Sequence, residues 1–174
     1  METNQLDATV RRIVAPPTRF IGVFAADQVP DLTRLTYFPS CLIANTDPST
    51  KAGQHWVAFW IDSPHSIDFF DSYGLGPQDY GFDIACSSIS TKSIQSPNST
   101  VCGQYCLYYL YVRSRGHTLA NFLNSFSLTN TTWNDRQVSR FVNKHFGISN
   151  PAETKFTCTQ SCRSRASLRF VSSS

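Results

Sequence analysis

The stretch from Thr100 to Arg113 constrains the fold more than any other part of the chain. Its side chains are apolar on nearly every face, and the run ends in Arg113, Arg115 and Gly116, which are typical of a helix C-terminus. A helix that lacks a polar face has to be covered by other elements on several sides. We therefore expect a buried central helix over 100–113.

Cys102 stands at the start of this predicted helix and is followed by Gly103. The partial positive charge at a helix N-terminus lowers the pKa of a thiol and stabilises the thiolate, which is its nucleophilic form. Asn98, Ser99 and Thr100 each carry a side chain that can cap the helix. The position of Cys102 predicts a nucleophile.

Two segments upstream predict a β-hairpin that brings a base and an acid together. Residues 55–61 and 67–73 are rich in β-branched and aromatic side chains, and turn-forming residues separate them. If the hairpin is centred on Pro64, the residue numbers of two directly opposed residues sum to about 128. The numbers of His55 and Asp71 sum to 126, so these residues lie within about one register step of being opposed, close enough for their side chains to meet. A carboxylate there would orient the imidazole. The alternative is a surface histidine that happens to lie beside a surface aspartate.

Gln95 precedes Cys102 in a loop rich in Ser, Pro and Asn. Such a loop can fold the amide of Gln95 back beside the thiol. The amide and the backbone N–H of Cys102 would then form an oxyanion hole. Together with His55 and Asp71, these residues predict the machinery of a cysteine protease.

The segments that carry these residues resemble the adenovirus endopeptidase family (adenain) and, more distantly, the proteases that remove SUMO-like modifiers. They are His55-Trp56, the Phe-Phe-Asp-Ser-Tyr-Gly segment 69–74, and the segment 95–103 from Gln95 to Gly103. Segments 20–24 and 41–46 are also similar, and the resemblance runs from about residue 5 to residue 146. It departs at Asp71, where adenain has Glu and the SUMO-protease relatives have Asp.

The resemblance implies that His55 is the base, Asp71 the orienting acid, Gln95 the oxyanion donor and Cys102 the nucleophile. It implies a papain-like or adenain-like α+β fold whose central helix carries the nucleophile. It further implies an endopeptidase that cuts next to glycine in capsid and core precursor proteins of a virus or virus-like mobile element, located in the virion and the host nucleus.

Two activators are also implied by the resemblance. In adenain, a cysteine at a spacing similar to that of Cys86 forms a disulfide with an activating peptide from a capsid protein; the alternative is a structural strand cysteine. Adenain also uses viral DNA as a cofactor, and the basic, Ser-rich segment 155–169 would contact it. The alternative for that segment is a solvated tail.

The length of 174 residues predicts one folded domain over 1–150 followed by a basic tail over 151–174. Hydrophobic residues make up 41% and charged residues 16%, which excludes a disordered chain, and the net charge of +3 is too small to identify a nucleic-acid partner. The chain has no apolar run of about eighteen residues and no charged-then-apolar leader, so we expect no membrane contact and no signal peptide. We therefore expect an intracellular protein with reduced cysteines and no metal or small-molecule cofactor.

The remaining segments predict helices around a mainly antiparallel sheet, which defines an α+β fold. Strands are expected near 20–24, 36–45, 55–61, 67–73 and 86–90, and helices over 3–14, 100–113, 118–126 and 134–145. We expect Thr118 to cap the third of these helices, and Asn134 and Gly147 to be the N-cap and C-cap of the last.

Three other interpretations compete with an endopeptidase. Cys102 and Cys106, with Cys158 and Cys162, repeat a C-x3-C spacing that can bind zinc, although a pair inside an apolar helix is poorly placed for a zinc knuckle. The same four catalytic residues would also serve a SUMO-type or ubiquitin-like isopeptidase. A non-catalytic relative that only binds DNA or a partner is the third, and the intact set of four residues argues against it.

Overall fold

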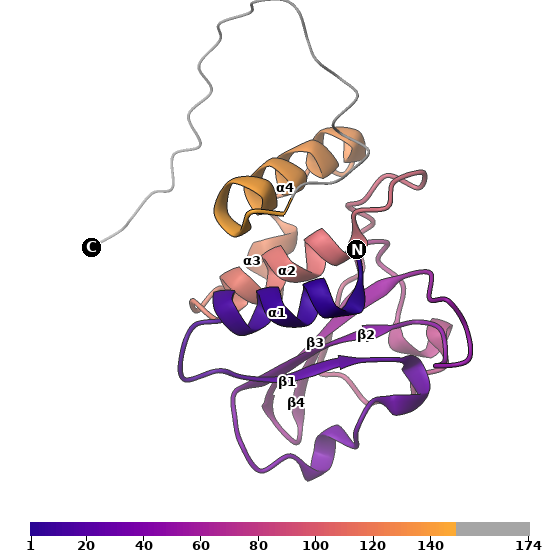
Figure 1. Ribbon diagram of the computed structural model, residues 1–174, viewed down its shortest axis with the longest axis vertical. Helices are drawn as coiled ribbons and strands as arrows, with labels where there is room; N and C mark the ends of the chain where they lie inside the picture. Colours follow the sequence, from indigo (N-terminus) through magenta and orange to yellow (C-terminus); the bar gives the residue numbers. More distant parts are fainter. Residues whose placement is uncertain (149–174) are drawn as a thin grey trace, which may run out of the picture.

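The computed structural model describes residues 1–148, in which helices cover one face of a five-stranded sheet (Figure 1). The predicted tail over 151–174, and with it the predicted DNA contact over 155–169, lies outside the described residues. The strands are β1 (Arg19–Phe24), β2 (Ser40–Asn45), β3 (Trp56–Ser63), β4 (Ser66–Phe70) and β5 (Ser88–Ile89), and they lie side by side in this order.

The predicted α+β class is confirmed, with an antiparallel centre and parallel edges. β2 pairs with β3 and β3 with β4 in antiparallel fashion, whereas β1 with β2 and β4 with β5 are parallel. The parallel pairs arise because long crossovers join these strands, which a tight turn could not do. The crossovers contain the short 3-10 helices η1 (Ala26–Gln28) and η2 (Leu32–Arg34) before β2, and η3 (Pro77–Tyr80) before β5.

The register of the β3–β4 hairpin is the predicted one. Ala58 pairs with Phe70 and Ile61 with Ile67, which is the pairing of a hairpin centred on Pro64. The pairing ends at Ala58 and Phe70, while β3 itself begins at Trp56. The expected site residues therefore flank the two strands: His55 directly precedes β3 and Asp71 directly follows β4.

The sheet is buried on both faces. Ile43 and Phe70 belong to a core shared with the helices, and Leu42 and Phe59 belong to a second core on the opposite face, which the crossover segments cover. All six residues of β2 are buried. A strand covered on both faces gains from a continuous apolar sequence, which is why β2 and β3 show little alternation.

The helices are α1 (Thr3–Ile13), α2 (Cys102–Arg113), α3 (Leu119–Leu123) and α4 (Thr131–Phe146). α2 lies between α1, α4 and β3 (Figure 1), and Tyr105 and Tyr109 on it are fully buried. The prediction of a buried central helix is confirmed. Within residues 1–148, no helix is both long enough and apolar enough to cross a membrane.

Of the three caps predicted for α3 and α4, two are confirmed and one is wrong. Thr118 accepts a hydrogen bond from the Asn121 N–H, and Gly147 ends α4 in the left-handed conformation. Asn134 is not an N-cap, because α4 begins one turn earlier with Asn130 in that position. The Asn134 side chain instead donates to the carbonyls of Ile94 and Ser127, at 2.9 and 2.6 Å, and so fastens two loops to α4.

Candidate active site

Three of the predicted site residues come together where the β3–β4 hairpin meets the first turn of α2. His55 directly precedes β3, Asp71 directly follows β4, and Cys102 is the first residue of α2. The packing of α2 on β3 places the helix start at the open end of the hairpin. His55 and Cys102 line a cleft of about 680 Å³, bordered on the other side by the loop from Asp47 to Gln54.

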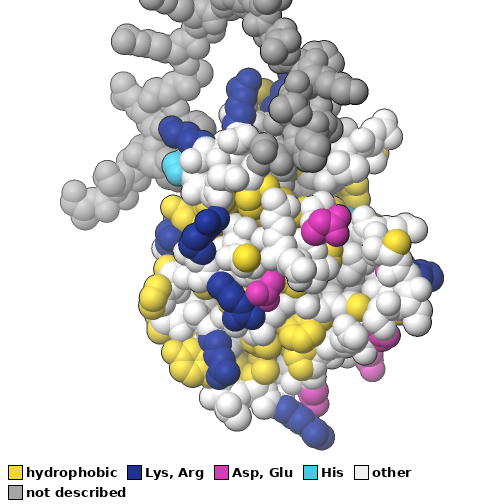
Figure 2. Space-filling model, in the orientation of Figure 1, with side chains coloured by type: hydrophobic (Ala, Val, Ile, Leu, Met, Phe, Trp, Pro, Cys, Tyr) yellow, Lys and Arg dark blue, Asp and Glu magenta, His cyan; other side chains and the backbone are white. Residues whose placement is uncertain are grey.

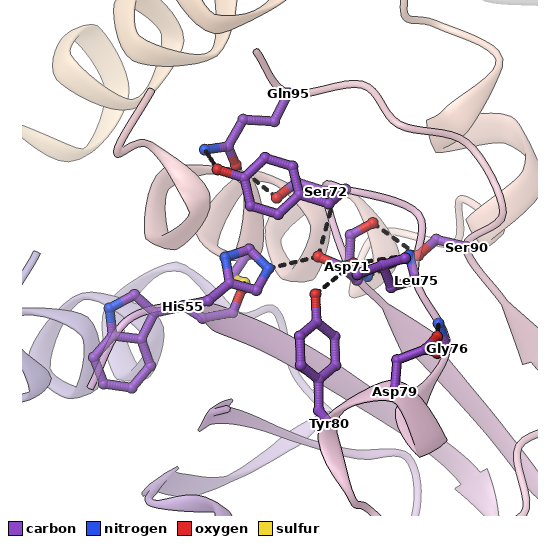
Figure 3. A network of polar contacts seen from close by, with 12 residues as sticks. His55, Asp71, Ser72, Leu75, Gly76, Asp79, Tyr80, Ser90 and Gln95 are labelled. Carbon is purple, nitrogen blue, oxygen red and sulfur yellow. Dashed lines mark hydrogen bonds and ion pairs between the residues drawn. The ribbon is translucent and has the colours of Figure 1, made fainter. Parts of the chain in front are cut away.

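His55 and Asp71 form a buried pair. His55 Nε2 lies 2.6 Å from Asp71 Oδ1 (Figure 3), and Asp71 is fully buried. The carboxylate also accepts hydrogen bonds from the backbone N–H groups of Tyr73 and Leu75 and from the Tyr80 hydroxyl, at 3.0, 2.9 and 3.1 Å. A carboxylate held by four donors keeps the imidazole in one orientation. Nε2 is thus engaged with Asp71, which leaves Nδ1 for a second partner.

That second partner is the Cys102 thiol. Burial by itself would lower the pKa of His55, but hydrogen bonds to Asp71 and Cys102 and the charges of both raise it to about 9. Burial would likewise raise the pKa of Cys102, but the hydrogen bond and positive charge of His55 lower it below its ordinary value. The opposite shifts favour a thiolate–imidazolium pair, in which the sulfur is an activated nucleophile.

The start of α2 has no side-chain cap. Val101 holds the N-cap position and makes no side-chain hydrogen bond, so the expectation that Asn98, Ser99 or Thr100 caps this helix is wrong. The Ser99 carbonyl accepts hydrogen bonds from side chains of the preceding loops instead. No capping side chain therefore competes with an anionic ligand for the backbone N–H of Cys102 at the start of α2.

Gln95 lies beside this site, and its amide is hydrogen-bonded to other residues of the protein. The residue is fully buried and does not line the cleft. Its Oε1 accepts from Ser72 Oγ at 2.6 Å (Figure 3), and its Nε2 donates to Tyr73 Oη at 3.1 Å and to the Ser99 carbonyl at 3.0 Å. Both amide hydrogens thus have acceptors within the protein.

Tyr73 is a site residue that the sequence reasoning missed. Its ring stacks on His55, with centroids 4.7 Å apart and planes at 27°, and it lines the cleft beside Cys102. The hairpin register contained the signal. Continuation of the observed pairing beyond Ala58 and Phe70 places Tyr73 opposite His55, two positions further on than Asp71.

Cys86 lies apart from this site. It is half-buried and lies two residues before β5. It lines a second cavity of about 750 Å³, which shares no described lining residue with the cleft. Burial, followed by the charge of Asp68, raises its pKa to about 11. Its thiol is therefore protonated at neutral pH and reacts slowly unless a partner activates it.

The zinc interpretation finds no support in the described residues. No group of three or more His, Cys, Asp or Glu between residues 1 and 148 is placed to hold a metal ion. Cys106 is completely buried one turn below Cys102, and its Sγ contacts the Trp56 carbonyl at 3.4 Å. Cys158 and Cys162 lie outside the described residues.

Sequence comparison identifies relatives among the adenovirus proteases. The chain is 26% identical to the protease of Bovine adenovirus 2 over 141 residues, which covers 61% of this chain and 69% of the relative. It is 28% identical to the protease of Porcine adenovirus A serotype 3 over 133 residues, with coverages of 64% and 63%. It is 30% identical to the protease of Human adenovirus A serotype 12 over 136 residues, with coverages of 62% and 61%. The chain is similar to the adenovirus proteases.

This similarity confirms the resemblance that the sequence motifs indicated. The matched regions span 61% to 69% of the three adenovirus proteases. No protein-family model matches the chain. A solved structure of a selenomethionine-labelled ASFV protease aligns at 24% identity with a TM-score of 0.38, over 56% of this chain and 42% of that one.

Proposed function

We propose that the protein is a cysteine endopeptidase of the adenovirus-protease type. One observation carries the proposal: His55 is bound at Nε2 to buried Asp71 and interacts with Cys102, and the pKa values of His55 and Cys102 are displaced in opposite directions. An inert surface histidine would have neither a buried carboxylate nor a thiol of lowered pKa as its partner. The similarity to proteins named proteases supports the same conclusion.

The reaction follows from this geometry. The Cys102 thiolate attacks the scissile carbonyl carbon, and the carbonyl oxygen becomes an oxyanion. The imidazolium of His55 gives its proton to the leaving amine as the C–N bond breaks, which leaves a thioester on Cys102. Neutral His55 then takes a proton from water, the resulting hydroxide displaces the thiolate, and the imidazolium is restored.

The oxyanion requires hydrogen-bond donors at the start of α2. The backbone N–H of Cys102 is one, since no side chain caps this helix terminus. The predicted second donor is the side-chain amide of Gln95, which is held beside the site by Ser72, Tyr73 and Ser99. Both donors would be fixed before substrate arrives, so little reorganisation is needed during the reaction.

We further propose substrates that are cut next to glycine, namely capsid and core precursor proteins of a virus or virus-like element. Support comes from the resemblance and from the aromatic side chains of Trp56 and Tyr73, which both line the cleft with Cys102. Bulky rings close to the nucleophile favour a substrate residue without a side chain. These substrates would place the enzyme in the host nucleus and in the virion.

We further propose two activators, a peptide and duplex DNA, and no metal or small-molecule cofactor. An activating peptide could lie along β5, a two-residue strand with a free edge, where the Cys86 thiol lines the adjacent cavity. Duplex DNA would contact residues 155–169. On the folded body, Lys and Arg side chains lie mainly on one half of the face drawn in Figure 2, and acidic side chains mainly on the other.

The test uses the purified full-length chain and two fluorogenic substrates, a short glycine-containing peptide and a Gly-Gly isopeptide conjugate. We expect cleavage of the first and labelling of Cys102 by a peptide vinyl sulfone. Preferential cleavage of the conjugate would establish an isopeptidase instead. A chain that neither cleaves nor reacts, with or without DNA, would be a non-catalytic binding protein.

A further inference from the structure

The backbone that carries Gln95 is held from two sides. On the side of the sheet, the N–H groups of Ile94 and Gln95 both donate to the Ser72 carbonyl, at 2.9 and 3.1 Å. On the side of the helices, the Ile94 carbonyl accepts from Tyr105 Oη at 3.0 Å and from Asn134 Nδ2 at 2.9 Å. An oxyanion donor is effective only where its position is fixed, so these contacts bear on catalysis.

Asp135 on α4 holds the residue that follows Gln95. The Ser96 N–H donates to both carboxylate oxygens, at 3.3 and 3.4 Å, and Oδ1 lies 2.9 Å from Tyr105 Oη. The phenol has one proton, which the Ile94 carbonyl and this oxygen share. Because α4 packs on α2 on the side away from the sheet (Figure 1), the carboxylate lies where both helices meet the loop of Gln95.

This carboxylate is buried without a cation. Asp135 has an exposed fraction of 8%, and within residues 1–148 no Lys, Arg or His lies within ion-pair distance of it. Burial raises its pKa, although hydrogen bonds from neighbouring groups oppose the shift. A buried carboxylate that lacks a cation destabilises the fold. An apolar residue would avoid that loss but could not accept a hydrogen bond from Ser96.

We propose that Asp135 is a positioning residue of the proposed oxyanion hole, which fastens the backbone on the far side of Gln95 to α2 and α4. With the Ser72 carbonyl on the other side, Gln95 is then held between the sheet and the helices. The inference rests on the proposed function and adds a residue of α4 to it. Asp135 touches no substrate in this role and transfers no proton.

The first test is Asp135→Leu in the full chain, because leucine fills the site and removes both acceptor oxygens. We expect kcat to fall by up to about 10²-fold with little change in KM, as for a misplaced catalytic group. Alkylation of Cys102 by iodoacetamide creates no oxyanion, and His55 is the charge that lowers the pKa of this thiol, so the alkylation rate should stay that of the wild type. Asp135→Asn keeps one acceptor oxygen and should recover most of the lost kcat.

The matched control is Ser139→Ala. Ser139 also lies on α4, and its Oγ donates to Gln104 Oε1 on α2 at 2.8 Å, so this hydrogen bond joins the same two helices without involving the loop of Gln95. We expect the variant to keep its kcat, even if its thermal unfolding midpoint falls. A fall in kcat equal to that of Asp135→Leu would overturn the inference, because any loosening of α4 would then suffice.

A double-mutant cycle asks whether Asp135 acts through Gln95. In a Gln95→Ala background the amide is already missing, so Asp135→Leu should change kcat little further. Equal losses in both backgrounds would overturn the inference, as would an unchanged kcat after Asp135→Leu in the wild-type background. A wild-type chain without cleavage or Cys102 labelling would instead refute the proposed function itself, so the two failures are distinguishable.

Tyr105→Phe keeps the inference testable if Asp135→Leu does not fold. Phenylalanine keeps the ring and removes the proton that Ile94 and Asp135 share. We expect a smaller fall in kcat, an unchanged alkylation rate, and no further loss when the substitution is combined with Gln95→Ala. Losses that multiply in the double variant would show that this hydroxyl does not act through the amide, and the assignment of Asp135 would fail with it.

Discussion

Cys102 and Cys106 lie one helical turn apart on α2, and both are buried, with exposed fractions of 6% and 0%. His55 lowers the pKa of Cys102 against the effect of burial. Burial and the charges of Cys102 and Asp71 raise the pKa of Cys106 well above its ordinary value. The first turn of α2 thus holds an activated thiol and the second an inert one.

The difference comes from the neighbours of each sulfur and not from burial or residue type. Cys102 faces an imidazole that a buried carboxylate keeps protonated, whereas Cys106 faces the Trp56 carbonyl and core side chains. Burial also raises the pKa of Cys41 and Cys86, so Cys102 is the only cysteine within residues 1–148 whose pKa is lowered. A nucleophilic cysteine therefore requires a fixed cation beside it.

The largest effect is expected from exchanging the two thiols for alanine one at a time. Cys102→Ala should abolish peptide cleavage with an unchanged thermal unfolding midpoint, because the nucleophile is lost and little volume changes. Cys106→Ala should retain most of the activity and lower the stability by about 1 kcal/mol through a small core cavity. Mass spectrometry after vinyl sulfone treatment should find the adduct on Cys102. An adduct concentrated on Cys106 or Cys86 would reverse the comparison.

Gln95→Ala is expected to have the next largest effect, a decrease in kcat of about 10²–10³-fold with little change in KM. The substitution removes the hydrogen bonds to Ser72, Tyr73 and Ser99, so the oxyanion donor is lost or misoriented. Steady-state kinetics with a glycine-containing peptide measures the effect, and circular dichroism checks the fold. An unchanged kcat would reduce Gln95 to a loop residue.

Asp71→Asn should reduce activity less than loss of Cys102 or His55, because the imidazole can still reach the thiol. The pKa of His55 is raised to about 9, so the imidazolium is present below that pH and is lost above it. Wild-type kcat/KM should accordingly decline above about pH 9. Without the carboxylate charge the pKa of His55 falls, and the alkaline limb should move to lower pH.

A pH–rate series from pH 5 to pH 10 for both proteins tests this expectation. The thermal unfolding midpoint is the control, because the substituted side chain would carry an amide N–H₂ where Asp71 now accepts hydrogen bonds. Coincident profiles would show that the carboxylate does not set the charge of His55. The lowered pKa of Cys102, in contrast to the raised pKa of Cys106, would then need another cause.

The smallest effect on the Cys102 site is expected from deleting residues 154–174. Basal peptide cleavage should be nearly unchanged, since His55, Asp71, Gln95 and Cys102 all lie upstream. Stimulation by duplex DNA should weaken, and the slope of log K against log salt should become less steep by about 0.9 for each phosphate that the segment neutralised. Fluorescence anisotropy at several salt concentrations measures the slope. An unchanged slope would place the DNA-binding surface on the folded body.

The sequence alone was sufficient to predict the structural features that depend on residues close together in the chain. The apolar run after Thr100 predicted a buried helix that begins near Cys102, and α2 begins there. The composition of 55–73 predicted the hairpin and its register, from which the approach of His55 to Asp71 follows. Periodicity and turn composition act over a few residues, so they can be read without knowledge of the fold.

Only the tertiary structure decided which groups hydrogen-bond to one another. The Gln95 amide is hydrogen-bonded to Ser72 and Tyr73, which lie more than twenty residues earlier in the chain. Asn134 is not the predicted helix cap, and its side chain instead donates to the carbonyls of Ile94 and Ser127 in two loops. The parallel pairing at both sheet edges likewise depends on the paths of the crossovers. Buried polar groups must find partners wherever the packed chain offers them, because an unpaired one costs about 1–3 kcal/mol. That requirement acts on the folded molecule as a whole, and it explains why the amide of Gln95 is bound by residues from separate loops, which no local sequence pattern could predict.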